Sequence, residues 1–182
     1  METQSLDRVA PSPDRERPIR KSLPAEARDA PPADGVFRPE VFFLGRTQGA
    51  GVVRDPLGRI IRRCAISTHG EFSPTYGAIH FDETFTFDDG QVDVWRWAMT
   101  PGRDGRYVAA EATVGSGIAA ETRGLDCHLT FHRRAGRAHS LLAPRYATRF
   151  TLLTPDMALK RARVSLLGVP LAILTAVHRR DG

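Results

Sequence analysis

The chain has 182 residues, of which 41% are hydrophobic, and this is enough for one ordinary domain with a buried core. Its formal net charge is +5, and most of the surplus comes from arginines late in the sequence. Two cysteines placed far apart and the lack of an apolar run of about 18 residues argue against a disulfide framework, a zinc site and a spanning helix.

Residues 1–36 differ in composition from the rest of the chain. They combine six of the prolines with alternating charges and almost no aromatic residues. Such a segment cannot bury enough apolar surface to offset the entropy lost on ordering, so a disordered tail is expected here. The first ten residues lack the apolar stretch of a signal peptide, which favours a cytoplasmic location.

Residues 37–182 read as one all-β domain. Short runs rich in Val, Ile, Phe, Thr and Trp alternate with turn signals, and only Asp156–Arg163 approaches a helical pattern. Successive hairpins without a crossover helix predict an antiparallel meander that closes into a barrel, because closure removes exposed edges. The expected strands are 40–54, 57–69, 76–87, 91–100, 105–114, 116–122, 124–133, 138–151, 155–166 and 170–179.

Glycines recur on alternate positions of the first expected strand, at Gly45, Gly49 and Gly51, and again at Gly115 and Gly117. Glycine weakens a strand, so clusters of it usually mark bends, bulges or a close approach of two backbones. We expect these positions to form the corners of a small barrel.

The segment Phe81–Trp97 predicts a hairpin with Asp89 and Gly90 as its two loop residues. In that register Glu83 faces Arg96 on a wall that is otherwise apolar, and Trp95 and Trp97 lie on the opposite face. The pair could anchor a ligand or could be a buried bridge that fixes the register. The residues expected to contact a ligand are Glu83, Arg96, Phe81, Phe85, Phe87, Val94 and Tyr107.

Several strings resemble a known family, the uncharacterised bacterial domain of unknown function 3833. They are Phe43–Asp55 with Gly58, then Phe81–Gly90, Trp95-Arg96, Tyr107 and Val114-Gly115. The resemblance covers roughly residues 37–180 and implies a lipocalin-like (calycin-type) barrel, but the family supplies no established activity. The chain departs from the family at Ala50, where a tryptophan is usual, and in its C-terminal third.

The favoured function is binding of a hydrophobic small molecule, such as a fatty acyl chain or an isoprenoid, with the Glu83–Arg96 pair at its polar end. The alternatives are a cofactor-independent enzyme acting on a lipid-like substrate, or a peripheral accessory protein on anionic membranes. No catalytic residue or cofactor is assigned. No metal is assigned either, because His128 and His132 share a strand face without a third ligand. Nucleic acid is not expected as a partner.

Overall fold

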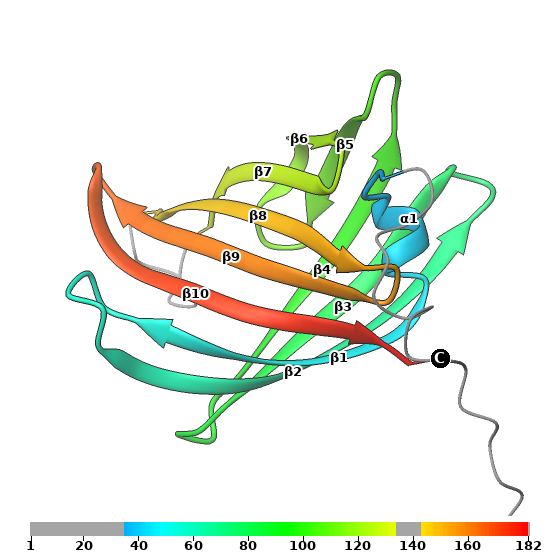
Figure 1. Cartoon of the computed structure of the whole chain (residues 1–182). Helices are drawn as coiled ribbons and strands as arrows, with labels where there is room; N and C mark the ends of the chain where they lie inside the picture. Colours follow the sequence, from blue (N-terminus) through cyan, green and yellow to red (C-terminus); the bar gives the residue numbers. More distant parts are fainter. Residues whose placement is uncertain (1–34, 134–142, 182) are drawn as a thin grey trace, which may run out of the picture.

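The computed structural model of the chain describes residues 35–133 and 143–181. Its strands form one closed antiparallel barrel in which each strand pairs with its neighbours in the chain and β1 pairs with β10 (Figure 1). The elements are α1 (Pro39–Phe42), β1 (Gly45–Arg54), β2 (Ile60–Ser73), β3 (Ala78–Phe87), β4 (Val92–Pro101), β5 (Arg106–Glu111), β6 (Gly115–Arg123), β7 (Asp126–His132), β8 (Arg145–Thr154), β9 (Met157–Leu166) and β10 (Val169–Arg180). The all-β barrel predicted from the sequence is confirmed.

All ten expected strands are present, and most of their bounds differ from the expected ones by a few residues. The first begins at Gly45 instead of residue 40, because Pro39–Phe42 forms a single helical turn that the sequence analysis missed. Asp156–Arg163, the most helix-like segment in sequence, lies at the β8–β9 turn and in β9. The predicted tail, up to residue 34, and residues 138–142 of the eighth expected strand lie outside the described residues.

The two ends of the barrel differ. Because consecutive strands are antiparallel, the hairpins β1–β2, β3–β4, β5–β6 and β9–β10 turn at one end, which we call the open end. Residues 35–44, including α1, cover the other end, which we call the closed end (Figure 1). There Phe43 stacks on Phe81 with 4.4 Å between ring centroids, and Phe37 and Phe42 are buried beside it. The hydroxyl of Tyr107 donates a hydrogen bond to Glu40 Oε2 at 2.9 Å.

The seam between β1 and β10 confirms the close approach expected at two of the glycines. Gly49 lies opposite His178, and a Cβ at Gly49 would overlap the carbonyl group of Val177. A Cβ at Gly51 would lie 2.6 Å from the Cβ of Ala176. Both contacts are shorter than real Cβ atoms tolerate, so side chains here would push the first and last strands apart.

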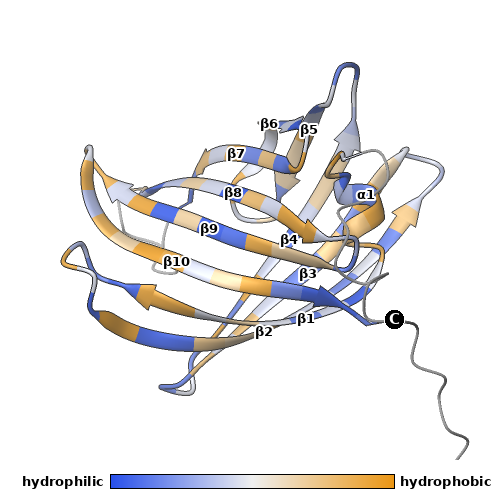
Figure 2. Cartoon of the chain, viewed as in Figure 1, coloured by the Kyte–Doolittle hydropathy of each residue, from blue (hydrophilic) through white to orange (hydrophobic). Residues whose placement is uncertain are grey.

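Apolar and polar residues alternate along most strands, as the bands of colour in Figure 2 show. Inward positions form the core and outward positions face solvent, which is the pattern of a sheet buried on one side. Cys64 and Cys127 are free thiols in this core, and burial raises the pKa of Cys127 to about 12. In the described part of the chain no helix is long and apolar enough to cross a membrane.

Candidate functional site

The hairpin between β3 and β4 has a three-residue loop, Asp88–Gly90, where the sequence analysis expected two residues. The Phe87 amide donates to the Gln91 carbonyl at 2.9 Å, and Gly90 takes a φ of 79°. A glycine in this left-handed region is typical of three-residue hairpins that end in a bulge. The extra loop residue shifts β4 by one position against β3, so Glu83 lies opposite Trp95.

This shift corrects the predicted pairing of Glu83 with Arg96. Arg96 points out of the barrel with 65% of its side chain exposed, and its Nε lies 3.8 Å from Asp82 Oδ2. Val94 shares that outer face, whereas Trp95 and Trp97 lie inside beside Glu83. A slip of one residue exchanges the two faces of a strand, so one wrong loop length misplaced every residue of β4.

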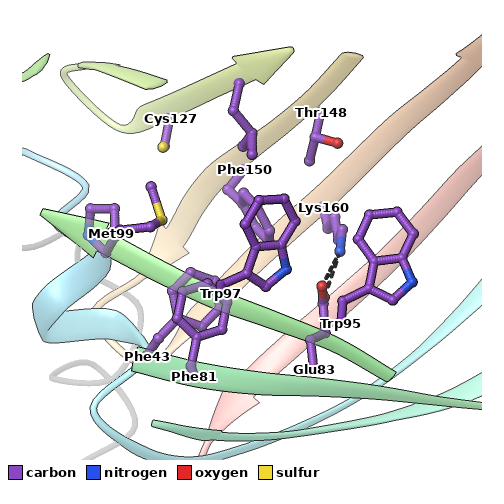
Figure 3. Close-up of a pocket in the computed structure, with 12 residues that line it drawn as sticks. Phe43, Phe81, Glu83, Trp95, Trp97, Met99, Cys127, Thr148, Phe150 and Lys160 are labelled. Carbon is purple, nitrogen blue, oxygen red and sulfur yellow. Dashed lines mark hydrogen bonds and ion pairs between the residues drawn. The ribbon is translucent and has the colours of Figure 1, made fainter. Parts of the chain in front are cut away.

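The partner of Glu83 is Lys160, which reaches it from β9 on the far side of the barrel (Figure 3). Lys160 Nζ lies 2.5 Å from Glu83 Oε1 and 2.6 Å from Oε2. Both residues are buried, with 1% of Glu83 and 3% of Lys160 exposed. A lysine ammonium has three donors, and two of them are taken by this carboxylate. The third has no acceptor among the described residues.

Alternation along β9 explains how Lys160 enters the barrel. Ala158 and Ala162 flank it on the same inward face, and their small side chains leave room for the long lysine stem. Lys160 was not predicted, because the late basic residues were considered only as a source of net charge. The composition did carry a signal, since Lys21 and Lys160 are the only lysines among 26 basic residues.

Aromatic rings surround the ammonium of Lys160. Nζ lies 4.8 Å from the ring centroid of Phe85, 5.2 Å from that of Phe150 and 5.6 Å from that of Trp95. The negative faces of such rings attract cations at these distances, particularly where water is excluded. The rings and Glu83 together hold the ammonium in an apolar interior.

His178 of β10 adds an imidazole to the Glu83–Lys160 pair. Its Nε2 lies 3.5 Å from Glu83 Oε1, and the residue is fully buried. Burial lowers the pKa of His178 to about 4, because desolvation of the charged ring outweighs the attraction of Glu83. Within the described residues, neither ring nitrogen makes a hydrogen bond, nor do the buried hydroxyls of Thr47 and Thr68. The interior therefore has polar groups with unused hydrogen-bonding capacity.

A cavity of about 470 Å³ opens at the open end and has Lys160 in its lining. We call this cavity the cup. Its lining is mostly apolar, and it is large enough for one small ligand. Its lining includes Val53, Arg62, Phe85, Phe87, Asp93, Trp95, Arg133, Tyr146, Thr148, Lys160, Ala162, Val164, Ala172 and Leu174.

Two of the seven residues expected to contact a ligand, Phe85 and Phe87, line the cup. Phe81 and Glu83 lie deeper, around a void of only about 10 Å³. Tyr107 is at the closed end, where burial and the neighbouring Glu40 raise its pKa. Val94 and Arg96 face away from the interior. The structure therefore brings four of the seven expected residues together in the interior, and Lys160 takes the place of Arg96 as the cation beside Glu83.

Two arginines lie at the rim of the cup, and each one is held in place. Arg133 donates to Asp93 through two nitrogens, at 2.8 and 3.1 Å, and its guanidinium lies 4.3 Å from the Trp95 ring centroid. Burial opposes ionisation of Asp93, but hydrogen bonds from Arg133 and Trp95 outweigh it and lower the pKa of this carboxyl. Arg62 lies 3.6 Å over Phe87 and donates to Asp89 at 2.7 Å.

A second hollow of about 670 Å³ lies along β5, β6 and β7. It is wide open to solvent, and its walls include Ile118, Leu129 and the exposed His128. Among the described residues, Tyr107 is the one aromatic residue in its lining, and the hollow lacks the buried ion pair of the cup, so the cup is the stronger candidate for a specific site. In the described part of the chain, no group of three or more His, Cys, Asp or Glu residues could hold a metal ion.

A closed antiparallel barrel of ten strands with a cavity at one end defines a lipocalin-like fold. Among solved structures, the S-type phycobiliprotein lyase from Guillardia theta is similar, with a TM-score of 0.59 and 12% identity over 82% of this chain and 96% of that one. A protein of unknown function from the DUF3598 family of Nostoc punctiforme has a TM-score of 0.59 and 10% identity, over 80% of this chain and 50% of that one. At such identities the likeness establishes the fold alone.

The chain belongs to the family described as protein of unknown function (DUF3833), which it matches over residues 24–180. This confirms the resemblance found in the sequence. A search of curated proteins gives no match.

Proposed function

We propose that the chain binds a hydrophobic small molecule, with a fatty acyl or isoprenoid-like body, in the cup. The observation that carries this proposal is the cup itself, an open cavity of about 470 Å³ lined by aromatic and aliphatic side chains. Pockets of this size and composition usually take one ligand, and a few polar groups fix its orientation. The similar barrel of a phycobiliprotein lyase supports the use of this fold around a small molecule.

The polar end of the ligand meets Lys160 in this proposal. Glu83 already neutralises the ammonium, so the pair presents one N–H donor and little net charge. A carbonyl, ester or hydroxyl oxygen suits such a donor better than a carboxylate does, because an added anion would be desolvated without a matching charge. The apolar body then lies against Phe85, Trp95 and Tyr146.

The proposal is tested by titrating the protein with retinol, an isoprenoid alcohol, and with parinaric acid, a fatty acyl probe. Both fluoresce when they enter an apolar site, and Trp95 provides an independent quenching signal. We expect saturable uptake of retinol, and at least about tenfold weaker binding by Ala172→Phe, which fills the mouth of the cup.

Arg96→Ala is the matched control, because Arg96 lies on the outer face of β4 and points away from the cup. It should bind retinol as the unchanged protein does. Native mass spectrometry of protein purified from its own host, followed by solvent extraction, would identify a resident ligand. Absence of uptake of both probes, together with empty protein from the host, would contradict the proposal.

A cofactor-independent enzyme acting on a lipid-like substrate is the second candidate, and the cluster of Glu83, Lys160 and His178 favours it. A neutral imidazole beside a carboxylate and an ammonium could accept and return a proton. Incubation with a host lipid extract distinguishes the two candidates. A bound compound released unchanged supports a binding protein, and a chemically altered product that is lost in His178→Gln supports an enzyme.

A further inference from the structure

The open end of the barrel carries exposed leucines at two hairpin tips. We propose that these tips, β1–β2 and β9–β10, dock the protein on an anionic lipid surface. This inference adds a second binding activity to the cup and does not depend on the identity or existence of a cup ligand. The surface concerned, which we call the docking tips, comprises residues 54–63 and 161–173.

The leucines are the strongest observation. Leu57, in the β1–β2 turn, is 79% exposed, and Leu167, in the β9–β10 turn, is 88% exposed. They are the two most exposed large hydrophobic residues in the part of the chain that the structure describes. Single exposed apolar residues are common on protein surfaces, but these two project from neighbouring tips with further apolar residues around them.

The two tips are neighbours because β1 pairs with both β2 and β10. Arg54, at the end of β1, lies opposite Ile60 in one strand and Ile173 in the other. Figure 2 shows apolar colour at both tips, on the same side of the barrel. The exposed apolar residues close to the leucines are Ile60, Ile61, Val169 and Leu171.

The backbone conformation at Leu167 indicates that the leucine is not there to stabilise the turn. Leu167 has a φ of 50° and the following Gly168 a φ of 84°. Two consecutive residues with positive φ are typical of two-residue hairpin turns, where Asn-Gly is the favoured sequence. A leucine tolerates this conformation poorly. Leucine at this position therefore does not stabilise the fold, whereas its exposed side chain can make an apolar contact with a surface outside the protein.

The charges around the docking tips complement an anionic surface. Residues 54–63 contain four arginines and one acid. Three of these arginines form ion pairs, Arg59 with Asp55 inside the segment and Arg62 and Arg63 with acids of the β3–β4 tip, and Arg54 forms no ion pair within the described residues. Residues 161–173 contain Arg161 and Arg163 and no acid. Each arginine near an anionic membrane adds electrostatic attraction to the insertion of apolar side chains.

The β3–β4 tip, also at the open end, differs from the docking tips in charge. Asp88 and Asp89 lie at the β3–β4 tip, where Asp89 pairs with Arg62 at 2.7 Å and Asp88 with Arg63 at 3.9 Å. With its two acids paired, the β3–β4 tip carries no positive charge of its own to attract an anionic surface. Contact is therefore made by the β1–β2 and β9–β10 side of the rim. Val53 and Leu174, which line the cup, belong to that same side.

The arrangement suits a lipid surface better than a protein or nucleic-acid partner. Two leucines on separate tips with arginines beside them form no groove for a protein partner. The headgroup region of a lipid bilayer can accommodate each tip independently. Nucleic acid would attract the arginines but offers no apolar environment for the leucines.

The experiment is co-sedimentation of the full chain with vesicles of phosphatidylcholine containing about one third phosphatidylglycerol, and with vesicles of phosphatidylcholine alone. We expect binding to the mixed vesicles that weakens as salt is raised. The double variant Leu57→Asn/Leu167→Asn should bind at least about tenfold more weakly, because it removes two apolar insertions. Its thermal stability should be equal or higher, since asparagine suits the positive φ at residue 167.

Tyr76→Asn is the matched control, because Tyr76 is 72% exposed in the β2–β3 turn at the opposite end of the barrel. It should bind the vesicles as the unchanged protein does. Absence of binding by the unchanged protein would overturn the proposal. So would equal binding by the double variant, which would assign the attraction to charge elsewhere in the chain, or an equal loss in Tyr76→Asn.

Discussion

The closed and open ends of the barrel are built from the same alternation of inward and outward residues, yet they differ in what the inward residues meet. At the closed end, Phe37, Phe42 and Phe43 from residues 35–44 fill the interior and pack on Phe81 and Phe150. At the open end, the inward residues face the cup, whose mostly apolar lining also includes the charged Arg62, Arg133 and Lys160. The difference indicates that tight packing at one end stabilises the fold and leaves the other end free for binding.

The largest expected effect comes from removing a ring at the closed end. Phe43 is almost fully buried and contacts aromatic rings from several elements. Phe43→Ala should lower the free energy of unfolding by about 4 kcal/mol, because it combines lost apolar burial with a cavity. Urea denaturation measures this change. Val92→Ala at the exposed rim of the cup should change it by less than about 0.5 kcal/mol, and similar losses at both ends would refute the division of roles.

The next effect concerns the ion pair at the boundary between packed core and cup. Lys160→Met keeps a long apolar stem but leaves the Glu83 carboxylate buried without its partner. Loss of about 3 kcal/mol of unfolding free energy is expected. The double variant Lys160→Met/Glu83→Gln should recover much of it, because no buried charge remains. If the double variant were no more stable than the single one, packing and not charge would explain the loss.

A third prediction concerns acid. The pKa of His178 is about 4 in the folded chain, below its ordinary value of 6.5, so the unfolded chain binds more protons between these values. The stabilisation from a neutral His178 is complete above pH 6.5 and is lost as the pH falls towards 4. We expect this residue alone to remove roughly 2 to 3 kcal/mol of unfolding free energy between pH 7.5 and 4.5.

The measurement is the unfolding free energy of the unchanged protein and of His178→Gln across that range. Glu83 and Lys160 face the ring and are common to both proteins, so the difference between the curves isolates the histidine. Parallel curves would show that His178 does not cause the acid sensitivity.

The smallest effect is expected at the rim. Asp93→Asn removes one of two carboxylates that pair with Arg133, but Arg133 Nε keeps a hydrogen bond to Thr113 Oγ1 at 3.0 Å and lies 3.7 Å from Glu111 Oε2. Asp93 is partly exposed, so water screens the pair, and a loss of about 1 kcal/mol is expected. Thermal unfolding resolves such a change. A loss as large as that in Phe43→Ala would mean that the open end also determines stability.

The sequence predicted the barrel well because strand periodicity and turn residues are local signals. It misplaced β4 because Asp89-Gly90 is compatible with both a two-residue loop and the end of a three-residue loop. Residue propensities do not distinguish the two loop lengths, and the loop length decides whether Arg96 or Trp95 faces inward. The pattern itself offered a hint, since a register that leaves Trp95 and Trp97 outside requires another cover for them.

The partner of Glu83 could not be predicted from local sequence patterns, for a different reason. Lys160 lies 77 positions away in the chain, and the two meet only because the barrel closes and brings β3 and β9 face to face across its interior. His178, from a third strand, joins them in the same way. No spacing rule connects these residues, whereas the strands that carry them were each predicted.

The pairing of β1 with β10 has a consequence for how the protein is made. Gln48 and Asp181, which meet where these strands join, are 133 positions apart. During synthesis one edge of β1 therefore stays unpaired until β10 has left the ribosome. Until then the sheet has two unpaired edges, on β1 and on β9. Contacts between such distant positions form slowly. A nascent or truncated chain without its final strand should be the form that chaperones recognise and that aggregates most readily.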